Sequence, residues 1–219
     1  EDTALSNQSA GATHRLRMNV NVTNAVLPAG NEFKLQYATS TGGPWMEVGQ
    51  FASSTDWRGY NNTSTADGTT VTSAKLTSTS ALETFEESNP STTTPNAIGI
   101  NGYGEWDWVL KNNTAAGDET YSFRMIYASS TPLDSYVRYP TLSTGAPTLT
   151  QSGFRVYENT DALQPTTALA DEDTNALGIN LSDIIRFRTR MTVSDAPLKK
   201  GAQFKLQFAT DTGGPWTDV

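Results

Sequence analysis

The chain has 219 residues, enough for one large domain or two small ones with a buried core. Its net charge of −8 argues against nucleic acid and anionic membranes as partners, because both require a basic surface. It contains no cysteine and no apolar run of membrane-spanning length, which excludes disulfides, Cys-ligated metals and membrane insertion within this segment.

Alternation of apolar and polar residues predicts most of the secondary structure as β-strands. The first strand spans 14–22 and the second spans 32–38. The turn sequence Thr41-Gly42-Gly43-Pro44 then joins the second strand to a third one at 45–51 in a β-hairpin. Further strands are predicted at 105–111, 120–128, 135–142, 153–158 and 184–193.

One stretch is compatible with a helix. Residues 80–87 contain the sequence ALETFEE, which favours a short helix. They lie in a tract from 77 to 104 that is longer than ordinary loops in compact domains. We interpret this tract as a loop insertion.

The chain repeats itself. Residues 33–48 read FKLQYATSTGGPWMEV and residues 204–219 read FKLQFATDTGGPWTDV, so that Phe33 aligns with Phe204. In the same alignment residues 1–48 match 172–219 without a gap, and 21 of the 48 positions are identical. The chain is therefore interpreted as one period of a tandem repeat followed by the opening of the next.

The order of these segments resembles fibronectin type III and related Ig-like modules, particularly the repeat modules of large bacterial surface proteins. The hairpin at 36–48 resembles their C–C′ hairpin, and TYSFRMIYA resembles strand F, with Tyr121 at its opening. The resemblance implies an antiparallel β-sandwich and an extracellular or cell-surface location. The period of 171 residues departs from the ~100 of an Ig-like domain, so either the module carries insertions around 55–104 or it is a different β-sandwich.

This resemblance implies a register. Residues 1–148 would form a first Ig-like module without its initial strand, and residues 149–219 would supply strands A, B and C of a second, truncated copy. Three strands cannot bury both faces of a sheet, so adjacent repeats or other copies are the expected partners, joined covalently or by strand exchange. The expected assembly residues are Phe154, Val156, Tyr157, Phe187, Phe204, Leu206, Phe208 and Trp216.

The expected function is therefore structural: a repeat of a surface protein, filament, stalk or adhesin. An enzyme is not expected, because His14 is the single histidine and there is no cysteine nucleophile. Paired carboxylates for glycoside chemistry occur at Glu86-Glu87 and at Glu105 and Asp107, and exposed polar strand faces are the expected explanation for them.

Two ligand sites are also considered. The acidic residues Asp161, Asp171, Glu172 and Asp173 lie in a loop between predicted strands, a setting that suits Ca²⁺, and no other cofactor is indicated. The alternative explanation for them is a solvated acidic loop.

The second candidate site would bind glycans. Trp57, Tyr60 and Tyr103 lie in predicted loops, where aromatic rings can stack on sugars. The alternative function is thus an accessory carbohydrate-binding module of a secreted enzyme.

Overall fold

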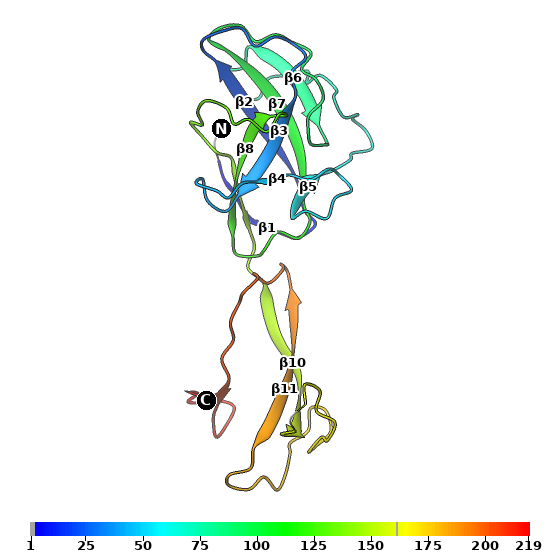
Figure 1. Ribbon diagram of the computed structural model, residues 1–219, viewed down its shortest axis with the longest axis vertical. Helices are drawn as coiled ribbons and strands as arrows, with labels where there is room; N and C mark the ends of the chain where they lie inside the picture. The colour runs from blue at the N-terminus through cyan, green and yellow to red at the C-terminus, as the bar shows by residue number, and fades with distance from the viewer. Residues whose placement is uncertain (1–2, 161) are drawn as a thin grey trace.

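The computed structural model describes residues 3–160 and 162–219, and these form thirteen β-strands and no helix (Figure 1). No described segment is a helix long and apolar enough to cross a membrane. The strands are β1 (Leu5–Gln8), β2 (Thr13–Val22), β3 (Phe33–Ala38), β4 (Met46–Glu47), β5 (Trp57–Gly59), β6 (Ala81–Glu86), β7 (Gly102–Asn112), β8 (Thr120–Tyr127), β9 (Thr141–Thr144), β10 (Thr148–Glu158), β11 (Ile185–Ser194), β12 (Gln207–Phe208) and β13 (Thr217–Asp218).

Two sheets make up the first part of the chain. One has the strand order β1-β9-β8-β3-β4, and the other has the order β2-β7-β5, with β6 also paired to β7. Most pairs are antiparallel, while β1 with β9 and β6 with β7 are parallel. The architecture is all-β and consistent with a β-sandwich.

The core lies between these two sheets and follows from strand alternation. Trp106 and Trp108 of β7 point inward together, as their spacing predicts, and Phe33 meets Trp106 edge-on with ring centroids 5.0 Å apart. Leu35 and Phe123 pack into the same cluster from β3 and β8. All of the buried members of this cluster lie between residues 16 and 142.

The outer face of the β2–β7 sheet is also covered. A second, smaller apolar cluster joins Val71, Phe85 and Val109, with Tyr60 and Leu82 packed against it. The segment before β6 therefore lies over the sheet, and the tract at 77–104 contains an edge strand in addition to loops.

The second part of the chain is open. β10 and β11 form a two-stranded antiparallel sheet that extends away from the sandwich, and β12 and β13 form a separate short hairpin (Figure 1). Polar contacts between this part and the first include a hydrogen bond from the Gly117 N–H to the Pro197 carbonyl at 2.8 Å and an ion pair of Lys199 with Glu119.

The β12–β13 hairpin repeats the pairing of β3 with β4. Gln36 lies opposite Glu47, and Gln207 lies opposite Asp218, and these positions align in the two similar segments 1–48 and 172–219. The two ion pairs that flank these hairpins also correspond, Lys34 with Glu47 at 3.0 Å and Lys205 with Asp218 at 2.9 Å.

Three sequence-based expectations are wrong. Residues 81–86 are strand β6 and not a helix, because Leu82 and Phe85 pack on the outer cluster while the strand pairs with β7. The strand expected at 135–142 begins only at Thr141, and the strand expected at 45–51 is reduced to Met46–Glu47.

Candidate functional site

The most unusual surface of the molecule is the apolar side of its second part. Three side chains of β3 that are buried in the sandwich have exposed counterparts at the aligned positions of residues 172–219. Their exposed fractions are 0% for Phe33, 0% for Leu35 and 2% for Tyr37, against 58% for Phe204, 51% for Leu206 and 57% for Phe208. We use the term open face for two separate sets of exposed apolar residues, these three and the apolar side of β11.

The apolar face of β11 follows from its alternation. Phe187, Met191 and Val193 point to one side and are each about half exposed, as is Trp216 in the hairpin beyond. Phe187 aligns with Leu16 of β2, which is buried in the sandwich. The sequence thus places core residues on a sheet that no described strand covers.

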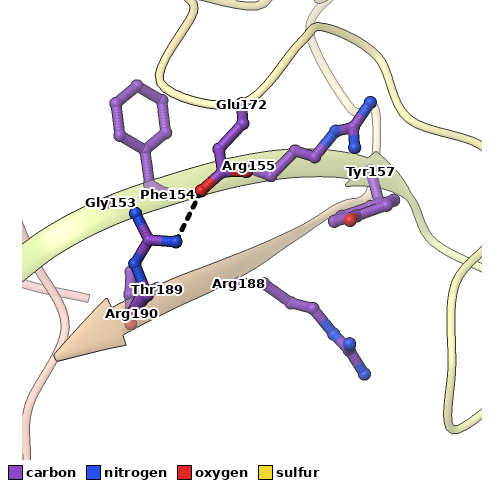
Figure 2. A pocket seen from close by; sticks show the side chains of 8 residues that line it. All are labelled: Gly153, Phe154, Arg155, Tyr157, Glu172, Arg188, Thr189 and Arg190. Atoms are coloured by element: carbon purple, nitrogen blue, oxygen red, sulfur yellow. Dashed lines mark ion pairs between the residues drawn. The ribbon is translucent and has the colours of Figure 1, made fainter.

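The opposite face of the same sheet is basic. Arg155 of β10 and Arg188 and Arg190 of β11 line a shallow hollow of about 210 Å³ together with Tyr157 (Figure 2). Arg190 forms an ion pair with Glu172 at 2.9 Å. Because Arg155 lies directly opposite Arg188 in the strand pair, their side chains share this face.

The arginines of β2, which align with Arg186 and Arg188, are already neutralised. Arg17 forms ion pairs with Glu105 at 2.7 Å and with Asp107 at 3.0 Å, and Arg15 also pairs with Asp107. Both carboxylates belong to β7 and are fully buried. Buried charges of this kind persist only when paired and hydrogen-bonded.

Glu105 holds the covering segment in place as well. Its carboxylate accepts hydrogen bonds from the backbone N–H groups of Lys75 and Leu76 and from the Thr79 hydroxyl. Burial raises the pKa of Glu105, but the hydrogen bonds from Thr79, the two N–H groups and Arg17 outweigh it and lower that pKa. The carboxylate is therefore kept ionised.

The carboxylates considered for catalysis are buried rather than exposed, so the expectation of polar strand faces is wrong. Glu86 and Glu87 are buried beside the segment at 62–67 and Thr92, and Glu105 and Asp107 are engaged by arginine. His14 is buried too, with its ring centroid 6.0 Å from that of Trp57.

The predicted assembly residues split into two groups. Val156 is buried, and Phe154 and Tyr157 are half-buried on β10. The remaining five are exposed: Phe187, Phe204, Leu206, Phe208 and Trp216. The structure brings Phe154, Val156 and Phe187 onto one sheet, and it places Phe208 and Trp216 on the separate hairpin.

The predicted calcium ligands do not converge in the described residues. Asp171 lies 3.8 Å from Arg155, Glu172 pairs with Arg190, and Asp173 accepts a hydrogen bond from the Phe154 N–H at 2.8 Å. Asp161 lies outside the described residues, which contain no group of three acidic or histidine side chains placed to hold a metal ion. The calcium site stays a prediction.

The predicted glycan-binding residues do not form a platform. Trp57 lies in the core, edge-on to Tyr121 and Phe123, so its expected exposure is wrong. Tyr60 packs on the outer cluster, and Tyr103 is half-buried on β7.

Another aromatic row was not recognised in the sequence. Trp45 stacks on Tyr139 with ring centroids 5.6 Å apart, and Tyr139 stacks on Tyr136 at 5.5 Å. The Arg124 guanidinium lies 4.2 Å from the Trp45 ring centroid. These rings come from loops that no alternation pattern connects.

Comparison with protein-family models, with curated proteins and with solved structures finds no match to this chain.

Proposed function

We propose that this chain is a structural repeat of an extracellular surface protein, filament, stalk or adhesin. Its modules are Ig-like or fibronectin-like β-sandwiches in tandem, and strands of a neighbouring repeat or a second copy complete each one. The observation that carries the proposal is the open face, whose residues repeat core residues of the first sheet.

The energetics of burial support this function. Covering one large apolar side chain contributes about 1.5–3 kcal/mol, and monomeric proteins rarely expose a connected apolar surface. A surface of sheet edge and aromatic rings suits another strand better than a small molecule. The Thr-, Ser-, Asn- and Gly-rich composition supports an extracellular location and a non-enzymatic role.

The test is self-association of the full chain, measured by analytical ultracentrifugation over a wide concentration range. We expect oligomers that grow with concentration and that Phe187→Asp abolishes. Val137→Asp is the matched control, because Val137 is 91% exposed and lies in a loop of the first part. A chain that stays monomeric, or that associates equally well in both variants, contradicts the proposal.

One observation favours the alternative function of a carbohydrate-binding module. The row of Trp45, Tyr139 and Tyr136 presents stacked rings beside a guanidinium group, a surface suited to sugar rings. A glycan array with the full chain tests it. Binding that Tyr139→Ala removes supports this function, and an array without signal eliminates it.

A further inference from the structure

We propose that the free edge of β11 accepts a β-strand in which carboxylates alternate with tryptophans, the β7-type strand of another copy of the repeat. This chain's own example is Glu105-Trp106-Asp107-Trp108 within β7. The inference rests on the proposed function and names the partner strand, its edge and its register.

The direction of the backbone groups identifies the free edge. In β10, the carbonyls of Phe154 and Val156 accept hydrogen bonds from Asp173 and Leu169, so these residues point their backbone groups away from β11. Arg155 therefore points toward β11, where it lies opposite Arg188. Since bonding alternates along antiparallel strands, the N–H and C=O groups of Phe187 and Thr189 face the free edge.

The same edge is occupied in the first sheet. The Asn112 N–H of β7 donates to the Ala12 carbonyl at 2.9 Å, so alternation points Leu16 and Met18 of β2 toward β7. Phe187 and Thr189 are the repeat counterparts of Leu16 and Met18. The free edge of β11 thus corresponds to the β7 edge of β2, and β10 leaves it open.

The register follows from the first sheet. There Leu16 lies opposite Trp108, Arg17 opposite Asp107, and Met18 opposite Trp106. The same register applied to β11 would place Phe187 opposite a tryptophan, Arg188 opposite an aspartate, and Thr189 opposite a second tryptophan. The incoming tryptophans would point to the apolar side of β11. Phe204, which aligns with Phe33, the ring that packs on Trp106, lies on the separate C-terminal segment.

The positive charges on the basic face of β11 complement the carboxylates of the incoming strand. Arg186, Arg188 and Arg190 alternate along β11, and Arg190 replaces Asn19, which lies opposite Glu105 in the first sheet. β11 is therefore more basic than β2.

Arg186 and Arg188 now have weaker partners than a buried carboxylate, whereas Arg190 pairs with the exposed Glu172. Arg186 donates to the carbonyls of Ala162 and Thr160, and Arg188 donates to the carbonyl of Leu163 at 3.2 Å. Charge-assisted pairs with carboxylates are stronger than such bonds. An acidic strand can therefore displace these carbonyls.

The experiment uses the full chain and a fluorescent synthetic peptide with the sequence of residues 102–112, GYGEWDWVLKN, followed by anisotropy. We expect saturable binding that weakens at least about tenfold when the peptide carries Gln and Asn in place of Glu105 and Asp107. Arg188→Ala in the chain should weaken binding by a similar factor. Lys200→Ala, which removes an exposed positive charge beyond β11, should leave it unchanged.

A separate variant tests backbone hydrogen bonding at the free edge of β11. Thr189→Pro removes an N–H that faces the free edge and keeps the bonds to β10, so it should weaken binding, whereas Thr189→Val should not. Circular dichroism checks the fold of both variants, and Arg188→Ala serves if the proline variant does not fold. Equal binding of the acidic and neutral peptides, or full binding by Arg188→Ala, overturns the proposal.

The two proposals fail separately. If the chain self-associates through Phe187 but the peptide does not bind, the assembly function stands and this partner strand is wrong. If the peptide binds in the expected register while the chain remains monomeric at all concentrations, the edge assignment stands and the assembly function is wrong.

Discussion

Leu35 and Leu206 occupy the same position in two copies of the sequence Phe-Lys-Leu-Gln, yet Leu35 is fully buried and Leu206 is 51% exposed. Local sequence is therefore not what buries Leu35. Its environment comes from β8 and from the opposite sheet, where Phe123, Trp106 and Trp108 complete the cluster. The difference in exposure between Leu35 and Leu206 shows that burial at this position requires the complete sandwich.

Truncation at these two positions should have unequal effects on stability. Leu35→Ala is expected to lower the free energy of unfolding by about 2–5 kcal/mol, because it leaves a cavity in the core. Leu206→Ala should lower it by less than about 1 kcal/mol in dilute solution. Urea unfolding of both variants checks this, and equal losses would show that Leu206 is buried in solution.

Arg17 and Arg188 form a second pair of aligned residues in different environments. Arg17→Ala leaves the buried carboxylates of Glu105 and Asp107 short of a partner and should cost about 3 kcal/mol of stability. Arg188→Ala removes an exposed donor and should cost less than about 1 kcal/mol. Thermal unfolding at low and high salt measures both, and a small effect of Arg17→Ala would mean that Arg15 alone neutralises the cluster.

Glu86 should make stability depend on pH. Burial, partly offset by hydrogen bonds from Thr84 and Thr92, raises the pKa of Glu86 to about 7. A carboxyl group with a raised folded-state pKa binds its proton more tightly in the folded state. Its contribution to folding stability is therefore fully present below its unfolded-state pKa. That contribution is lost as the pH rises through about 7.

We therefore expect Glu86 to cost the folded state on the order of 3 kcal/mol at pH 8 relative to pH 4. Glu86→Gln should flatten this part of the stability profile and raise stability at pH 8. Glu158→Gln, at an exposed position, is the control. A parallel profile for wild type and Glu86→Gln would assign the pH dependence to another group.

Trp57 should behave as a core residue. Its ring lies 5.2 Å from that of Phe123, so Trp57→Ala is expected to cost about 3–5 kcal/mol and to broaden or abolish the unfolding transition. Trp216→Ala, at a 54% exposed position, should leave the urea midpoint nearly unchanged. Wild-type stability of Trp57→Ala together with lost sugar binding would restore its expected role in glycan recognition.

The strands that alternate strictly could be predicted from the sequence. β2, β3, β7, β8 and β11 agree with expectation within a few residues, because one face of each carries core residues. The strands that were not predicted are short or lie at an edge. β5 has three residues, and its role depends on pairing with the distant end of β7.

The candidate site was predictable only in part. Phe187 and Phe204 could be predicted as assembly residues from the repeated sequence, because they align with apolar residues of predicted strands. The burial of Glu105 was not predictable, because it depends on a segment near Lys75 that covers this side chain and has no alternation of its own. The row of Trp45, Tyr136 and Tyr139 joins two separate loops, so only the folded chain reveals it.

The three arginines on one face of β11 also disfavour one symmetry of the proposed association. Two copies that met through their β11 edges about a two-fold axis would bring guanidinium groups side by side, and like charges across strands repel. A closed dimer through this edge is therefore disfavoured. Contacts between two different surfaces do not close in pairs, and they propagate as rings or as open fibres with a head and a tail.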